Sequence, residues 1–165
     1  MAPDLTSLPP RRGSRPATTQ TNPHLQIDQQ PTDPSIRDEL TRRVWGLAHV
    51  REEPSGISVP GARALVLEES SRGVGPPEAF MVGREFAHLH PDPDMSLHVM
   101  LPVDVAREVM DAGWGEPHVM VSKGFAPPTA VMLYAPRDRT ELEIVHRLVC
   151  LSHGFATGAW GEAAS

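Results

Sequence analysis

Residues 84–101, REFAHLHPDPDMSLHVML, contain two strand-like runs, 84–90 and 96–101, separated by a loop rich in proline and aspartate. A Pro/Asp cluster between two such runs predicts a β-hairpin. If the loop spans residues 91–95, His90 pairs with Ser96 and His88 pairs with His98. This hairpin decides the fold, because its register determines which side chains enter the core.

The register sorts the hairpin side chains by polarity. A one-residue shift would mix polar and apolar residues on both faces, so the pattern favours this register. One face receives a consistent apolar set: Ala87, Leu89, Leu97, Val99 and Leu101. The other face, on the side away from the main core, receives Phe86, His88, His90, Ser96, His98 and Met100. Three imidazoles are therefore expected to lie close together.

Three interpretations of these histidines stay open. Neutral imidazoles with open coordination positions can hold zinc, copper or iron. Histidine is also a general acid or base near neutral pH, able to deprotonate and orient an enol or phenol. Alternatively, the histidines are partly exposed sheet residues with no chemistry. His118 is a fourth candidate if its loop folds over the sheet.

The remaining elements predict an α+β fold, with a small antiparallel sheet packed against about three helices. Asp33 and Pro34 start a helix over residues 34–48, and Asp138 with Glu141 starts one over 139–152 that ends at Gly154. Gly113 ends a short helix. The spacing of apolar residues predicts that this short helix spans residues 103–112. It also predicts strands over 62–68, 119–121 and 130–135, with loops between them.

Composition divides the chain into a domain and two tails. Seven of the 18 prolines precede residue 35, among few large apolar residues, which predicts a disordered tail over residues 1–32. The α+β domain is expected to span residues 33–155. Glycine and alanine then dominate, so residues 156–165 are predicted to form a flexible C-terminal tail, in which Trp160 can dock onto the domain.

Charge and cysteine content exclude several classes of partner. A net charge of −6 argues against a nucleic-acid partner, which needs a basic surface. No apolar run reaches the roughly 18 residues of a transmembrane helix, so no membrane partner is expected. The single cysteine, Cys150, excludes an internal disulfide framework. The cytoplasm is the expected compartment, and a small molecule is the expected ligand. Protein partners and the oligomeric state are not predicted.

Four runs together resemble a known family. They are residues 84–90 (REFAHLH), 96–98 (SLH), 112–118 (AGWGEPH) and 133–137 (LYAPR). Their order and spacing are similar to those of the fungal luciferase domain and its bacterial relatives, the luciferase-domain proteins, over roughly residues 80–153.

The resemblance implies a reaction and a set of site residues. The fungal enzyme oxidises a hydroxylated styryl-pyrone, 3-hydroxyhispidin, with molecular oxygen, losing carbon dioxide and emitting light, with no organic cofactor known. The matching histidines imply catalytic roles for His88, His90, His98 and His118. The other matching positions imply substrate binding by Arg84, Asp94, Trp114, Tyr134 and Arg137. By its place after a strand, Arg137 can equally bind an anion or pair with Asp138 or Glu141.

Two departures limit what is carried over. The tail is polar and proline-rich where the fungal protein has an apolar membrane segment, so membrane attachment is not carried over. One tyrosine, four phenylalanines and three tryptophans offer few platforms for a flat phenolic substrate, so light emission is not expected. The resulting prediction is an oxygenase-type enzyme acting on a small enol, pyrone or aromatic compound, with oxygen as co-substrate and a His-bound metal left open. The alternative is a non-catalytic accessory domain that binds a metal or ligand.

Overall fold

Six antiparallel strands form one sheet in a computed structural model that describes residues 8–162. Neighbouring strands follow the order β1-β2-β3-β4-β6-β5. Their bounds are β1 Val50–Pro54, β2 Arg63–Leu67, β3 Glu85–Leu89, β4 Leu97–Met100, β5 Gly115–Pro117 and β6 Ala130–Leu133. The chain thus has the predicted α+β fold.

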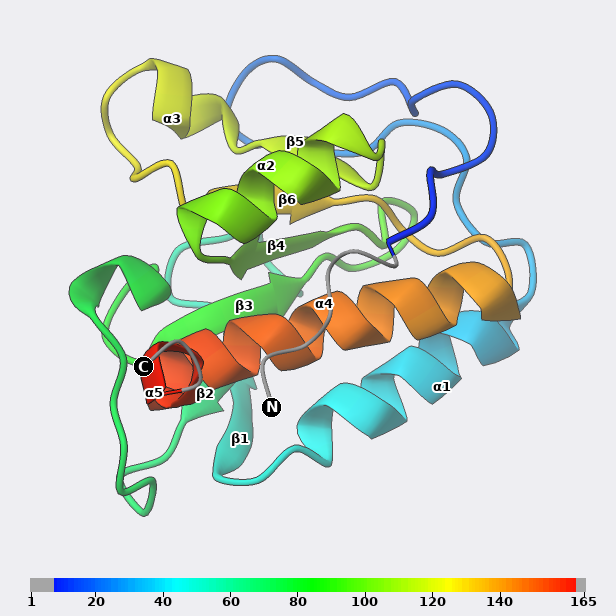
Figure 1. The fold of residues 1–165 in the computed structure, drawn as a ribbon. Coiled ribbons are helices and arrows are strands. Elements are labelled where there is room, and N and C mark those ends of the chain that lie inside the picture. Colours follow the sequence, from blue (N-terminus) through cyan, green and yellow to red (C-terminus); the bar gives the residue numbers. More distant parts are fainter. Residues whose placement is uncertain (1–7, 163–165) are drawn as a thin grey trace.

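The helices of the described residues flank this sheet, and α1 and α4 lie side by side across one of its faces (Figure 1). None of them is long and apolar enough to cross a membrane. They are α1 Pro34–Trp45, η2 (a 3-10 helix) Pro77–Ala79, α2 Val103–Asp111, α3 Val119–Ser122, α4 Arg139–Thr157 and α5 Ala159–Glu162.

The predicted hairpin register is confirmed, with Ala87 opposite Val99, His88 opposite His98 and Leu89 opposite Leu97. The apolar face of the hairpin enters the main core, where it packs with buried side chains of α1 and α4. Leu40 and Val44 of α1 contribute to this core, as do Leu142, Val145, Leu148 and Val149 of α4. The histidines consequently lie on the face of the sheet opposite α1 and α4.

Both predicted helix starts are confirmed by their caps. The Asp33 side chain accepts from the backbone N–H of Ser35, and the Asp138 side chain accepts from that of Glu141. However, α4 continues through Gly154 to Thr157, because Phe155 and Ala156 extend its buried face. Residues 156–162, predicted as part of a flexible tail, are therefore largely helical in the structure, and Trp160 packs against the core. Residues 163–165 lie outside the described residues.

Two local predictions are corrected. Residues 119–121, apolar and β-branched, were predicted as a strand but belong to α3, which begins where the His118 side chain accepts from the Met120 backbone N–H at 3.0 Å. The strand in this region is β5, just before His118. Strand β1 was not predicted, because it is an exposed edge strand with charged side chains and no apolar alternation.

Phe86 lies on the other face from the one predicted. In the pairing of β2 with β3, Leu65 lies opposite Ala87 and Val66 lies opposite Glu85, which leaves Phe86 as the extra residue of a β-bulge. Its ring lies in the core, with its centroid 5.9 Å from that of His153 on α4. The sequence register assumed unbroken alternation, which the bulge interrupts.

The N-terminal segment, residues 8–32, lies against the domain (blue in Figure 1). It has no helix and only an isolated bridge between Thr18 and Gln26, in keeping with its composition. Yet it is held in place: the Arg15 guanidinium donates to the Gly115 carbonyl at 2.9 Å, and the Arg11 backbone N–H donates to that of Ala112 at 2.8 Å. The prediction of disorder considered only how little apolar surface this segment can bury. In the structure, hydrogen bonds hold the segment against the domain. Residues 1–7 lie outside the described residues.

Candidate functional site

Five histidines converge on the face of the sheet opposite α1 and α4. His98 lies at their centre, with its ring centroid 4.3 Å from that of His118 and 4.6 Å from that of His90. The centroids of His88 and His24 lie 5.1 and 5.3 Å from it. Strands β3 and β4 carry His88 and His98, and His90 directly follows β3. The loop before α3 positions His118, and the N-terminal segment supplies His24. All except the half-buried His118 are buried.

Three of these rings form a hydrogen-bonded row between two carboxylates, here called the histidine chain. His88 Nδ1 lies 2.8 Å from Glu85 Oε2, and its Nε2 lies 3.0 Å from His98 Nδ1. His98 Nε2 in turn lies 3.2 Å from His24 Nδ1. The row ends at Glu116, whose Oε2 lies 3.0 Å from His24 Nε2. The N-terminal segment thus completes a network that begins in the sheet.

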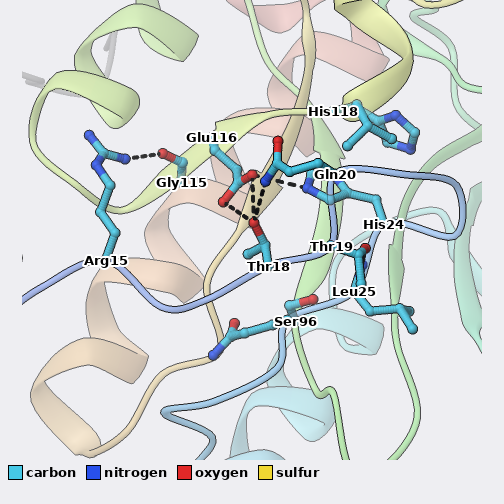
Figure 2. Close-up of polar contacts among 12 residues, drawn as sticks. Arg15, Thr18, Thr19, Gln20, His24, Leu25, Ser96, Gly115, Glu116 and His118 are labelled. Carbon is cyan, nitrogen blue, oxygen red and sulfur yellow. Dashed lines mark hydrogen bonds and ion pairs between the residues drawn. The ribbon is translucent and has the colours of Figure 1, made fainter.

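The carboxylates at both ends are ionised by the groups around them. Burial alone would raise the pKa of Glu85, but hydrogen bonds from His88, the Gly56 N–H and the Ser55 hydroxyl together lower it. At the other end, Glu116 receives hydrogen bonds from Thr18 and His24, as Figure 2 shows.

The Tyr134 hydroxyl donates a further hydrogen bond to Glu116 at 3.0 Å. These donors outweigh the effect of burial, which would raise the pKa of Glu116, and the net shift is downward. Both ends of the histidine chain are therefore acceptors at neutral pH.

His90 has a carboxylate of its own. Its Nδ1 lies 3.0 Å from both the Ser96 hydroxyl and Asp94 Oδ2. Asp94 also accepts from the backbone N–H groups of Ser96 at 3.0 Å and Gln26 at 3.2 Å. Burial opposes ionisation of Asp94, yet the contacts with His90 and Ser96 lower its pKa overall. The Nε2 atom of His90 is left facing the other rings.

Burial lowers the pKa of three of the imidazoles, those of His88, His98 and His118. Burial, followed by the neighbouring His90, lowers the pKa of His88 despite its contact with Glu85. Burial also lowers the pKa of His98, and the four surrounding imidazoles add to this effect. The pKa of His118 falls to about 4, mainly through burial and then through His24. Neutral imidazoles can accept a proton or coordinate a metal.

Two groups of three imidazoles have ligand atoms within 4.8 Å of one another: His88 with His90 and His98, and His24 with His98 and His118. The groups share His98. Because ring nitrogens at this spacing are compatible with coordination to one ion, either group could in principle hold a metal.

A cavity of about 430 Å³ opens over the histidines. One side of the cavity is formed by the five imidazoles, and the remainder is mostly apolar. The apolar lining includes Ile57, Val59, Phe80, Met81, Met100, Met120 and Phe125. Ile57 and Phe125 are 60% and 79% exposed, so they lie at its mouth. A volume of this size suits a small organic molecule.

The structure brings the four predicted catalytic residues, His88, His90, His98 and His118, around this one cavity. Two of the residues predicted to bind substrate lie behind the imidazoles. Asp94 contacts His90, and Tyr134 contacts Glu116, so both act on the site through another side chain.

The other three predicted substrate-binding residues do not line the cavity and have structural partners. Arg84 donates to the carbonyls of Leu67 and Glu68 at the end of β2. Trp114 is buried in the core, and its indole N–H donates to the Pro9 carbonyl. Arg137 forms an ion pair with Glu141, one of the two alternatives that its position left open.

Sequence reasoning missed His24, Glu85 and Glu116. His24 lies in the segment predicted to be disordered, where no periodic pattern marks it. Glu85 was missed because in a regular strand its side chain would point to the other face of the sheet from that of His88. Glu116 was the easiest to find, since it lies two residues before His118, and residues two apart in an extended chain share a face.

Comparison with known proteins finds similarity to one family. The family described as "Luciferase domain" matches residues 83–152. A protein named luciferase from Armillaria gallica is 31% identical over 166 residues, covering 93% of this chain and 62% of the relative, and that of Armillaria ostoyae matches to the same extent. A luciferase from Neonothopanus nambi is 40% identical over 76 residues, covering 45% of this chain and 28% of the relative.

This chain therefore spans less than two thirds of the length of the curated relatives that it matches. No solved structure matches it.

Proposed function

We propose that this chain, whose residues 83–152 match the luciferase-domain family, is an enzyme that oxidises a small enol, pyrone or aromatic compound with molecular oxygen. The observation that carries this proposal is the cavity, whose mostly apolar wall faces five imidazoles. An apolar cavity with a few convergent polar groups is the usual form of a small-molecule site.

The shape of the site supports an enzyme over a docking module. A docking surface would be flat and open, whereas these histidines lie buried beneath a cavity of about 430 Å³. The exposed rims formed by Ile57 and Phe125 supply apolar contact for a flat ring at the mouth. A non-catalytic accessory domain that binds a metal or ligand remains the second candidate, favoured only by the carboxylates behind the histidines.

In the proposed reaction, a neutral imidazole of the cluster removes the acidic proton of the bound substrate. His88, His90 and His98 are the candidates for this base as long as their ring nitrogens hold no metal ion. The resulting enolate is electron-rich, and its nucleophilic carbon can form a bond to one oxygen atom of O2. Two electrons pass from the substrate to O2, and the imidazolium returns its proton to the peroxide. For an enol, the balance is C=C–OH plus O2 giving the hydroperoxide O=C–C–OOH: the O–H bond and the C=C π bond are lost, and a C=O π bond, a C–O bond and a peroxide O–H bond are formed.

The proposal is tested by titrating the full chain with 3-hydroxyhispidin without oxygen, then measuring oxygen uptake after air is admitted. We expect saturable binding followed by oxygen consumption in proportion to bound pyrone. Replacing Phe125 or Ile57 with alanine should weaken binding, because each removes apolar contact at the mouth.

The matched control is Val74→Ala, which truncates an exposed apolar side chain that does not line the cavity. Equal affinity in all three variants would contradict binding in this cavity. Binding without any oxygen uptake would contradict the oxygenase reaction and favour the accessory-domain alternative.

A further inference from the structure

The histidine chain has one link more than the N–H groups of three neutral imidazoles can fill. It contains four links, and an ionised carboxylate accepts at each end, at Glu85 and at Glu116. A neutral imidazole carries only one N–H. Three imidazoles with one N–H each leave one of the four links without a proton, and either one further proton or a metal ion can fill it.

A metal ion between His88 Nε2 and His98 Nδ1 removes this mismatch. These nitrogens lie 3.0 Å apart, close to the roughly 3.3 Å between two ligand nitrogens of a tetrahedral zinc ion with Zn–N bonds of about 2.0–2.1 Å. With both lone pairs directed at the metal, each of the other three links has its own proton. His88 then donates to Glu85, His98 to His24, and His24 to Glu116.

His90 supplies a third ligand. Its Nδ1 faces Asp94 and Ser96, which leaves Nε2 free to coordinate, and the ligand atoms of the three rings lie within 4.8 Å of one another. We infer that His88, His90 and His98 bind one divalent first-row transition-metal ion at the floor of the cavity. Imidazole ligands suit Zn, Cu, Fe or Ni.

The surroundings of these three rings have the features of a metal site's outer shell. Metal-bound histidines usually donate their second ring N–H to a carboxylate or a similar acceptor, which fixes the ring orientation. Glu85 takes this position behind His88, and Asp94 takes it behind His90. Behind His98 the acceptor is His24, backed in turn by Glu116. A bound cation would also balance the buried negative charge of these carboxylates.

The competing group of His24, His98 and His118 fails the same proton count. His118 Nδ1 accepts the Met120 backbone N–H at 3.0 Å, so a neutral ring carries its proton on Nε2. Coordination through Nε2 would require an imidazolate or the loss of this cap. His118 is therefore left as a hydrogen-bond donor beside the metal.

This inference deepens the proposed function, with which it shares the cavity, although metal binding can be measured without a substrate. Three protein ligands leave at least one coordination position open, as in catalytic metal sites. Because His88, His90 and His98 all line the cavity, the open position would face a bound molecule.

The test uses the full chain, stripped with a chelator, dialysed, and titrated with Co²⁺ and separately with Zn²⁺. We expect one equivalent of either ion by elemental analysis, and visible d–d absorption from bound Co²⁺. His90→Gln should abolish stoichiometric binding, whereas His118→Gln should retain it. Glu85→Gln should weaken binding by about 10–100-fold, because it removes the carboxylate behind His88. The surface control His49→Gln should match the parent.

The absence of stoichiometric binding of both ions by the stripped parent would overturn the inference, and so would unchanged binding by His90→Gln. Equal losses in His90→Gln and His118→Gln would overturn the choice of ligands. If His90→Gln fails to fold by circular dichroism, X-ray absorption of the cobalt-loaded parent decides, with three imidazole ligands expected and fewer contradicting the site. Pyrone oxidation by metal-free protein would leave the proposed function standing without the metal, and metal binding without pyrone binding would do the reverse.

Discussion

Glu85 and His88 lie three residues apart along one strand, yet their side chains meet on the same face of the sheet, with Glu85 Oε2 2.8 Å from His88 Nδ1. In a regular strand, residues three apart point to opposite faces. The β-bulge at Phe86 inserts one extra residue and so reverses the alternation on one side of it. The bulge therefore sends the Phe86 ring into the core and brings a carboxylate to the histidines.

Replacing Glu85 with glutamine should destabilise the metal-free protein by about 1–3 kcal/mol. The buried carboxylate accepts from the Ser55 hydroxyl, the Gly56 N–H and His88, and an amide cannot accept from all three in the same way. Urea unfolding measures the difference. Glu108→Gln, an exposed change on α2, serves as the control and should stay within about 0.5 kcal/mol of the parent. Similar midpoints for both variants would contradict a supporting role for Glu85.

Replacing Arg15 with alanine should loosen the N-terminal segment without loosening α4. The guanidinium donates to the carbonyls of Gly115 and Met110, so its loss removes two anchors of this segment. Hydrogen exchange by mass spectrometry should show faster exchange over residues 15–28. Arg51→Ala, which removes an exposed arginine of β1, should leave that exchange unchanged. Full exchange of this segment in the parent within the dead time would contradict its placement.

Glu141 should stabilise the fold most at neutral pH. Burial would raise its pKa, but hydrogen bonds from Arg137 outweigh this effect and lower it below the ordinary value of 4.5. A group with a depressed pKa contributes stability above its unfolded-state value, and this contribution is lost as the pH falls through the folded-state value. Glu141→Gln should therefore be less stable than the parent by about 1–3 kcal/mol near neutral pH, with a smaller difference in acid.

Thermal melts between neutral pH and acid measure this trend. The matched control is Glu143→Gln on the same helix, because Glu143 is exposed and pairs with Arg43 at the surface. Its effect should stay below about 1 kcal/mol at every pH. A difference between the parent and Glu141→Gln that grows on acidification would contradict the sign.

Cys150 should react slowly with thiol reagents while the protein is folded. Burial raises the pKa of its thiol above the ordinary 9.0, so little of the reactive thiolate forms near pH 8. A disulfide reagent should modify the thiol slowly in buffer and rapidly in urea. Because this is the single cysteine of the chain, the absorbance change reports on it alone. Equal rates in buffer and urea would contradict this protection.

The parts of the fold that were predicted correctly are those whose apolar residues recur at regular spacing in the sequence. Alternation along residues 84–101 set the hairpin register, and helical spacing with a cap located α1 and α4. The same alternation predicted that His88, His90 and His98 lie together, and the family resemblance added His118; all four line the cavity. Their proposed roles await the experiments described above.

The remainder depends on features that leave no such pattern. A β-bulge arises from the pairing of two strands, so the sequence of β3 alone does not predict that the Glu85 side chain contacts His88. Polar contacts, not apolar burial, hold the segment that supplies His24. Likewise, the β-branched residues of α3 favour a strand by propensity, and the local cap from His118 overrides them.

The contacts of the N-terminal segment also bear on self-association. Exposed sheet edges invite pairing with other chains, and charged side chains or covering segments prevent it. At one edge, β1 presents Arg51, Glu52 and Glu53. At the other edge, the N-terminal segment covers β5. There the Arg15 guanidinium donates to the Gly115 carbonyl, and the Thr18 hydroxyl donates to the Glu116 carboxylate. The stretch that brings His24 to the site thus also shields the second edge, so loss of this segment would open both the cavity and a surface for aggregation.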